Sequence, residues 1–429
     1  MFASRRHLNL RLFYNPSSRP VKEMLDIWPE VLIFIDLDVF DYPSEETRDV
    51  ISEEIKDDIV AALRLNHQVS GICFGNVSDS GWEIIAPLMQ HPFPVLTHLC
   101  VHSCLPFHLN NTIPRSFLSG SAPSLQHLDL AGIPFPELPE LLLSSTTNLV
   151  RLCYDDIPRS GYISPQAMAT GLSALARLES LSLKYPSPDS FPDSPSQTNS
   201  PHTRTLLPAL TDLRFRGVAG YLDDLAAQID TPSLEGMDIW LFHQEVLDVS
   251  ELAKFVRRAD KLSLVDQARV AFYSDEVHIA LPQKEYDDRK TLMLYLACPE
   301  SDLRLSYLAE ICASCLPTLY PFQVLRIGAE DYPPWEDVVD SPDPQWLDLL
   351  CLFSCVKDLR LSGSAPLRVS KILRGLPAER VAEVLPALNN IFISGLKRFG
   401  PVREAISGFE DAREHSDHPV SVYYSNGSM

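Results

Sequence analysis

The sequence predicts an α/β solenoid, in which short strand–helix units stack into one elongated array with an inserted strand/helix region. Three observations predict this fold. A pattern of three apolar residues recurs along most of the chain, amphipathic segments separate its copies, and leucine is the commonest of the 429 residues. Each strand–helix unit is too small to bury its own apolar face, so stacking against its neighbours closes a continuous core.

The repeated pattern is L-x-x-L-x-L, with other apolar residues allowed at its three fixed positions. Positions four and six alternate inward on a short strand, and position one fills the turn before it. Seven copies follow one another at intervals of 24–32 residues and three more follow later, beginning at Val69, Leu96, Leu125, Leu149, Leu178, Leu210, Leu234, Phe322, Val356 and Leu388. These intervals are typical of an irregular leucine-rich-repeat solenoid, with parallel strands on its concave side and helices outside.

The segments around the repeats predict the remaining elements. Amphipathic stretches between strands predict helices at 138–143, 165–175, 221–229 and 345–352. Alternating apolar residues predict a first strand at 7–14 and a last strand at 420–424. Residues 25–36 and 51–65 are expected to cap the N-terminal end of the array.

The repeat interval breaks between residues 246 and 320, where we expect an insertion into the solenoid. Helices are predicted at 250–259 and 303–315, and locally antiparallel strands at 268–273, 277–281 and 292–296. The chain then divides into an N-terminal capping segment (1–64), the repeat array (65–245), this insertion (246–320), and C-terminal repeats with a cap (321–429).

Two segments are expected to lack regular structure. Residues 186–205 are a disordered Ser/Pro-rich loop within the array, either a tolerated insertion or a target of proline-directed phosphorylation. Residues 330–344 are acidic and interrupted by prolines, which favours a solvated connection over a partner-binding loop.

Charge disfavours a nucleic-acid partner. The chain has 57 acidic and 36 basic residues, a net charge of −21, and would repel phosphate backbones unless its basic residues gathered on one face. The densest basic stretch, residues 254–261, fits the end of a helix instead.

Hydropathy predicts no membrane span, because no run of eighteen apolar residues occurs. A secretory signal is not expected either, since the N-terminus lacks an apolar core. Residues 1–22 are basic and free of acids, as in a mitochondrial presequence, but a first strand is the better interpretation. We therefore expect an intracellular protein, cytoplasmic or nuclear.

Nine cysteines form no dense framework. Those in predicted strands are Cys73, Cys100, Cys104 and Cys153. Those at helical spacing on apolar stripes are Cys312, Cys315, Cys351 and Cys355. Cys312 and Cys315 have the CxxC spacing, but no second pair completes a zinc site. Buried free thiols in a reducing compartment are the expected state.

An apolar stretch at 31–35 ends in Asp36 and Asp38, and this D-x-D motif resembles the first motif of haloacid-dehalogenase-type phosphatases. Such an enzyme uses one Asp as nucleophile and the other as general acid, with Mg²⁺ between carboxylates. The only later candidates for its other groups are Lys284, Asp287 and Asp288, and the residues leading to them (Gln283, Glu285 and Tyr286) do not form a buried strand. A phosphatase using Asp36 and Asp38 is therefore the alternative to a protein without enzymatic activity.

Positions three, five and seven of each copy point away from the core, onto a face where neighbouring strands lie about 4.8 Å apart. Three successive strands would gather polar side chains there: His98, Cys100, His102, His127, Asp129, Arg151, Cys153 and Asp155. A His/Cys/Asp cluster so placed could hold a metal ion. A mixed polar surface without ligand geometry is the favoured interpretation, and we assign no metal and no cofactor.

Farther along the same face, the predicted partner-binding residues are Arg214, Arg216, Asp238 and Trp240. An exposed Trp beside Arg residues is the kind of anchor that dominates protein interfaces. A Trp folded over its neighbours fits the sequence equally well.

Several segments carry a family resemblance: LDIWP at 25–29, DDIVAAL at 57–63, GYISP at 161–165, LPALTDL at 207–213, YLDDL at 221–225 and QWL at 345–347. Together they resemble the F-box-like leucine-rich-repeat proteins of mushroom-forming basidiomycete fungi, over about residues 10–425. The resemblance implies a non-catalytic protein–protein interaction module.

In that family an F-box, a small helical module that docks on the Skp1 subunit of a ubiquitin ligase, usually precedes this region. We expect the F-box to be missing from this chain, because the chain begins at what resembles the first strand after it. Skp1 is therefore an expected partner only if an F-box exists upstream in a longer product, which would make the protein a substrate-recognition part of an SCF-type adaptor. Otherwise this member keeps the recognition array alone.

Overall fold

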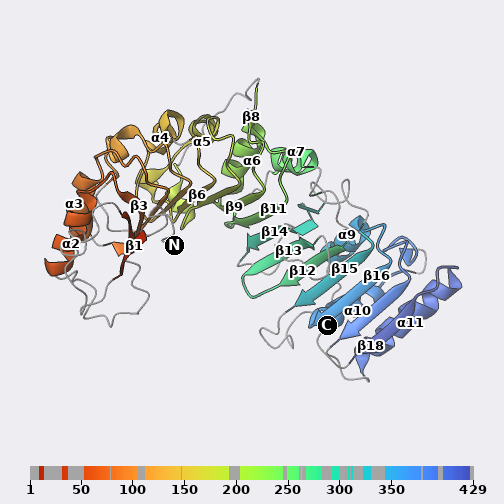
Figure 1. Ribbon diagram of the computed structural model, residues 1–429. Helices are drawn as coiled ribbons and strands as arrows, with labels where there is room; N and C mark the ends of the chain where they lie inside the picture. The colour runs from red at the N-terminus through yellow and green to blue at the C-terminus, as the bar shows by residue number, and fades with distance from the viewer. Residues whose placement is uncertain are drawn as a thin grey trace, which may run out of the picture. The chain divides into compact units, whose positions relative to one another are not determined.

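The computed structural model shows a mixed α/β protein whose strands are mostly parallel (Figure 1). It describes residues 9–13, 31–36, 53–77, 79–103, 112–145, 147–192, 203–244, 249–259, 262, 267–282, 291–298, 305, 308–309, 311–312, 322–329, 344–377, 380–394 and 400–425. The chain forms two compact units: Met1–Gly217 with Ala227–Pro232, and Val218–Ala226 with Ser233–Met429.

The first unit contains a sheet whose described strands are all parallel and follow the order of the chain. They are β1 (Asn9–Phe13), β2 (Leu32–Asp36), β3 (Val69–Val77), β4 (His98–Ser103), β5 (His127–Ala131), β6 (Arg151–Asp155), β7 (Ser180–Lys184) and β9 (Asp212–Gly217). The segments between them include α2 (Glu53–Leu63), α3 (Asp79–Leu88), η3 (Phe117–Gly120), α4 (Leu138–Ser145), η4 (Arg159–Gly161), α5 (Pro165–Leu172) and η5 (Pro188–Ser190). The helices line one face of this sheet (Figure 1). A separate small sheet pairs β8 (Thr205–Leu206) with β10 (Ile229–Asp230).

The second unit contains a sheet in the order β11-β14-β13-β12-β15-β16-β17-β18. Its strands are β11 (Gly236–Leu241), β12 (Gln267–Phe272), β13 (Glu276–Pro282), β14 (Thr291–Ala297), β15 (Val324–Ala329), β16 (Asp358–Gly363), β17 (Asn390–Ser394) and β18 (Ser421–Ser425). The helices of this part of the chain are α6 (Ala219–Gln228), α7 (Ser250–Arg258), α9 (Pro344–Leu352), α10 (Ala365–Arg374) and α11 (Pro401–His415). Helix α10 packs on β15, β16 and α11.

The repeated apolar pattern forms the core, as the sequence predicts. All three fixed positions are buried in all ten copies. The parallel register pairs the same motif position of successive copies: Leu99 faces Leu128, which faces Leu152 on the next strand. Position two joins the copies before each strand begins, because its amide donates to the carbonyl of position two in the preceding copy, as from Thr97 to Ser70 at 2.8 Å. Each copy therefore completes the hydrogen bonding and the apolar burial of its neighbour.

The insertion runs within the second sheet. Strand β13 is antiparallel to both β12 and β14, which confirms the predicted local antiparallel pairing. Strand β14 is parallel to β11, and β12 is parallel to β15, so the inserted strands lie between two repeat strands. Helix α7 ends with Arg257 and Arg258 in its last turn, where the basic stretch was expected. The described residues of the helix predicted at 303–315 are helical.

Two expectations about the N-terminal segment and the Ser/Pro loop need correction. Within residues 25–36, the described residues form strand β2, which pairs in the sheet between β1 and β3, so this part of the expected cap is a strand of the sheet. The Ser/Pro segment is ordered at both ends: η5 begins it, Phe191 packs against Tyr185 with ring centroids 4.3 Å apart, and Thr205 pairs in β8. Residues 193–202 and 330–343 lie outside the described residues.

The cysteine assignments are confirmed for the strands and corrected at one helix. Cys73, Cys100 and Cys153 lie in strands, and every described cysteine is a free thiol. Cys355 lies in an exposed turn after α9, because that helix ends at Leu352. Cys104 and Cys315 lie outside the described residues.

Replacing Leu128 by Asp should destabilise the first unit by about 4 kcal/mol or more, because the substitution buries an unpaired charge between Leu99 and Leu152. The exposed neighbour Gln126 supplies the control, and Gln126→Asp should change stability by less than about 0.5 kcal/mol. Chemical denaturation of both variants measures the difference. Equal stabilities would contradict the inward position of Leu128.

Gly363 ends β16 with a φ of +62°, and a Cβ there would collide with the backbone oxygen of Ala329 on the paired strand. We expect Gly363→Ala to destabilise the protein by about 2 kcal/mol or more, because it adds left-handed strain to a backbone clash. Gly220 in α6 has open space around its Cα, and Gly220→Ala should be neutral or stabilising by up to about 1 kcal/mol. Denaturation midpoints that move together in both variants would contradict this difference.

Candidate functional site

The face of the first sheet opposite its helices is called here the open face of that unit. It carries positions three, five and seven of each copy, and the register sets them in rows across the strands. The row of position five runs through adjacent strands as Asp36, Cys73, Cys100, Asp129, Cys153, Ser182 and Arg214. Residues that are distant in the sequence are therefore neighbours in this row.

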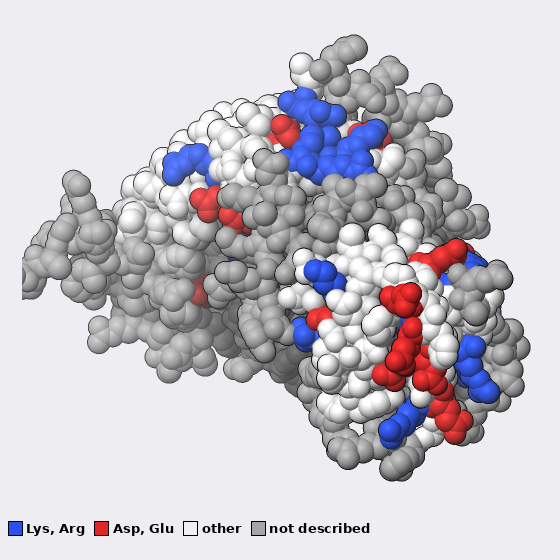
Figure 2. Space-filling view, turned by 90° about the vertical axis from the view of Figure 1, so that its right-hand side faces the viewer, with Lys and Arg blue, Asp and Glu red and all other residues white. Residues whose placement is uncertain are grey.

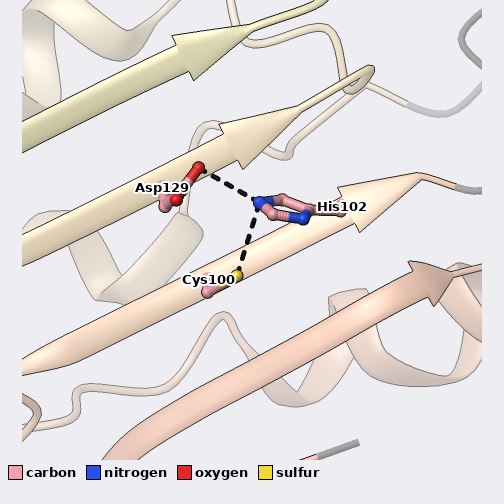
Figure 3. Close-up of side chains that lie close together, drawn as sticks. All are labelled: Cys100, His102 and Asp129. Atoms are coloured by element: carbon pink, nitrogen blue, oxygen red, sulfur yellow. Dashed lines mark hydrogen bonds and ion pairs between the residues drawn. The ribbon is translucent and has the colours of Figure 1, made fainter. Parts of the chain in front are cut away.

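Three side chains on β4 and β5 form a compact polar cluster (Figure 3). The ring of His102 turns back over the sheet, so that its Nε2 lies 3.1 Å from Oδ1 of Asp129 and 3.4 Å from Sγ of Cys100. All three potential ligand atoms lie within 4.8 Å of one another, and all three residues are half-buried. The structure thus brings three potential metal ligands together at this point of the polar surface.

The other polar residues predicted for this cluster bind elsewhere. Arg151 donates from Nε to Sγ of Cys153 at 3.3 Å, and burial raises the pKa of the Cys153 thiol. Asp155 accepts hydrogen bonds from Oγ of Ser182 at 2.8 Å and from Nζ of Lys184 at 2.9 Å. Cys153 and Asp155 therefore form hydrogen bonds with side chains of β6 and β7.

Two histidines stack beside the cluster. The rings of His98 and His127 stack with their centroids 4.4 Å apart and are nearly parallel, with an angle of 6° between their planes. Burial lowers the pKa of both imidazoles; the charge of His127 further lowers that of His98, and the charge of Arg151 further lowers that of His127. Both rings are thus favoured in their neutral form, which permits the close stacking of two basic side chains.

Gly71 makes room for an aromatic ring beside His98 and His127, which occupy the same motif position, position three, on the next strands. Gly71 pairs with both Phe34 and His98, and any Cβ on it would collide with the Phe34 ring. That ring lies 6.3 Å from the ring of His98. Phe34, His98 and His127 therefore form a continuous line of rings along one side of the polar cluster.

The structure places part of the predicted phosphatase motif. Asp36 is the last residue of β2 and pairs with Phe13 and Cys73, so it lies at the carboxyl end of a parallel strand. In the order of the sheet β2 is next to the first strand and is not central. Within the described residues Asp36 belongs to no group of three potential metal ligands. Asp38, Lys284, Asp287 and Asp288 lie outside those residues, so the phosphatase hypothesis stays a prediction.

The four predicted partner-binding residues belong to different units. Arg214 and Arg216 lie on β9 of the first unit, where Arg214 donates from Nε to Oδ2 of Asp212 at 3.1 Å. Asp238 and Trp240 lie on β11 of the second unit. A joint role for these four residues stays a prediction.

Trp240 is both folded against a neighbour and partly exposed, and its role as an interface anchor stays a prediction. Its ring stacks on the ring of Tyr295 with centroids 4.0 Å apart, and the residue nevertheless remains 38% exposed. His278 lies with its ring 4.5 Å from Tyr295 and 4.2 Å from Tyr273, and its Nε2 is 2.6 Å from Oε1 of Glu276. Burial and the charge of Asp238 raise the pKa of Tyr295. Trp240 is therefore part of an aromatic cluster spread over β11, β13 and β14.

The second unit also presents a row of arginines that the sequence did not reveal. Arg269 on β12 pairs in register with Arg326 on β15, which pairs with Arg360 on β16. The row continues into Phe392 and Tyr423, whose rings stack with centroids 5.0 Å apart. The Arg360 guanidinium lies 5.3 Å from the centroid of Phe392. Position five of the last repeats was the available signal, since Arg326, Arg360 and Phe392 all occupy it.

Neither a family model nor a curated protein matches the chain. Function must therefore be inferred from the residues themselves. Among the described helices, none combines the length and apolar character that crossing a membrane requires.

Proposed function

We propose that the protein is a non-catalytic repeat protein of the leucine-rich-repeat type, which binds an acidic segment of a protein partner on the second sheet. The observation that carries the proposal is the row of Arg269, Arg326 and Arg360, continued by stacked Phe392 and Tyr423. The repeated in-register strands support the repeat type, because each motif position forms a row of equivalent residues.

The arginine row favours an anionic ligand. Adjacent strands lie about 4.8 Å apart, and like charges directly opposite one another on paired strands are destabilising. Arg269 is exposed, and Arg326 and Arg360 are half-buried. A carboxylate placed over this row could accept two hydrogen bonds from one guanidinium.

The neighbouring residues favour an extended peptide. In the next row of the sheet, Ala271 pairs with Gly328, which pairs with Ser362. Because these residues are small, they project little from the sheet beside the arginines. Arg and aromatic residues are also the types enriched in the energetic centres of protein interfaces. An acidic segment with apolar or aromatic side chains would match both features.

The net charge of the chain favours a protein partner over a nucleic acid. The net charge of −21 repels a long polyanion, whereas a short acidic segment carries fewer charges into that field. Charge is unevenly spread: on the side drawn in Figure 2, Lys and Arg side chains gather in one area and Asp and Glu side chains in another. A strongly acidic chain can therefore still carry local basic areas, and the register of Arg269, Arg326 and Arg360 forms one of them on the second sheet.

The proposal extends to selection of proteins for ubiquitination, which rests on the resemblance to F-box-like fungal proteins. If an F-box belongs to the natural product, the full-length protein should bind purified Skp1, and the chain described here supplies the substrate-recognition surface. Failure of a full-length product to bind Skp1 would leave a plain binding array and would reject the adaptor role.

Peptide binding tests the arginine row. A fluorescein-labelled (Glu-Tyr)5 peptide should bind the protein in fluorescence anisotropy, and Arg326→Gln or Arg360→Gln should weaken binding at least about tenfold. Arg380→Gln is the control, because it removes the same charge from the second unit at an exposed residue that pairs with Glu383. Equal affinities for all variants would contradict the proposed surface.

Two further probes separate the alternatives in the same assay. A labelled (Lys-Tyr)5 peptide should bind much more weakly than (Glu-Tyr)5, since it would add like charge to the row. Labelled oligothymidylate should also bind weakly. Tighter binding of the oligonucleotide, lost in Arg326→Gln, would replace the protein partner by a single-stranded nucleic acid.

Hydrolysis of p-nitrophenyl phosphate in the presence of Mg²⁺ tests the absence of phosphatase activity. We expect no turnover above that of the Asp36→Ala variant, because β2 is not a central strand of its sheet. Turnover by the unaltered protein that disappears in Asp36→Ala would make Asp36 a catalytic nucleophile or acid, and would overturn the non-catalytic assignment.

A further inference from the structure

We infer that Cys100, His102 and Asp129 on the first sheet form a binding site for a divalent metal ion of the zinc class. The three ligand atoms converge within 4.8 Å of one another on the open face of that unit. This inference concerns a different unit and different residues from the proposed peptide surface, so either can fail without the other.

The donor set selects the kind of ion. The cluster offers one sulfur, one imidazole nitrogen and one carboxylate oxygen (Figure 3). Zinc accepts all three donor types, whereas magnesium and calcium prefer oxygen ligands alone. A borderline ion such as Zn²⁺, with Co²⁺ as its spectroscopic substitute, therefore fits this set better than a hard cation.

The spacing of the atoms agrees with a shared ion. Tetrahedral bonds of about 2.3 Å to sulfur and about 2.0–2.1 Å to nitrogen and oxygen separate the ligand atoms by about 3.3–3.6 Å. Nε2 of His102 lies 3.4 Å from Sγ of Cys100 and 3.1 Å from Oδ1 of Asp129. These two separations differ from the tetrahedral ones by a few tenths of an ångström, and the third, between Sγ of Cys100 and Oδ1 of Asp129, is within 4.8 Å.

The sheet holds the ligands in place. Cys100 and His102 are two residues apart on β4 and therefore lie on the same face, while Asp129 pairs directly with Cys100 from β5. Buried pairs beneath them fix this register, since Leu99 faces Leu128 and Val101 faces Leu130. A site on two rigid strands needs little ordering when it binds an ion.

The charge and the exposure of the three ligands also suit a divalent ion. A thiolate and a carboxylate neutralise the two charges of the ion, and the Cys100 proton is released to solvent on binding. The side chains of His102 and Asp129 are 39% and 35% exposed, so an ion can enter from solvent. Three protein ligands leave one tetrahedral position for water.

Cobalt titration of the purified protein tests the site. One equivalent of Co²⁺ should produce a thiolate-to-cobalt charge-transfer band and the intense visible absorption of tetrahedral cobalt, and Zn²⁺ should abolish both. Cys100→Ser should remove the charge-transfer band. His102→Gln and Asp129→Asn should each weaken binding at least about tenfold, since loss of even an outer partner of a metal ligand costs about 10–100-fold.

Two other cysteines of the same row supply matched controls. Cys73→Ser changes the residue paired with Cys100 on β3, and Cys153→Ser changes the thiol that accepts from Arg151. Both variants should keep the cobalt spectrum and its stoichiometry. Circular dichroism checks the fold, and if Cys100→Ser does not fold, the two polar variants decide by the same titration.

Three results would overturn the inference. They are no cobalt absorption at one equivalent, a charge-transfer band that survives in Cys100→Ser, and loss of binding in Cys153→Ser equal to that in His102→Gln. The first would mean that the cluster is only a hydrogen-bonded surface, and the others would place the metal elsewhere.

Discussion

The structure depends on the in-register pairing of equivalent positions in successive repeats. Two apolar residues of each strand face the same two positions of the next strand, and a third fills the turn before it. No repeat buries these residues alone, so register and core are one constraint: a slip by one residue would move the whole apolar set to the other face. The same constraint fixes the polar residues between them, and both proposed surfaces are consequences of it.

Much of the fold could be predicted from the sequence, because its information is local and periodic. Leu125, Leu128 and Leu130 indicate a turn and a strand within six residues, and ten such copies leave little ambiguity about the strands. Segments without that period were less predictable. Strand β2 carries no complete motif, so residues 25–36 were expected to be a cap, and helices α10 and α11 were not predicted.

The candidate sites were harder to predict, since they depend on which strands become neighbours. The cluster of Cys100, His102 and Asp129 could be foreseen as a group because β4 and β5 are consecutive repeats. Its ligand geometry could not, because it depends on the rotation of the His102 ring back over the sheet. The arginine row combines Arg269 from the insertion with Arg326 and Arg360 from later repeats, and no local pattern connects these three.

The insertion also has a geometric consequence. In a meander, consecutive strands alternate in direction, so its first and last strands run the same way only when their number is odd. Strands β12, β13 and β14 satisfy this parity: the first and third run with the flanking repeats and the middle one runs against them. The sheet is thereby widened by about 14 Å at about 4.8 Å for each strand. The sheet gains area while every later repeat keeps its polarity.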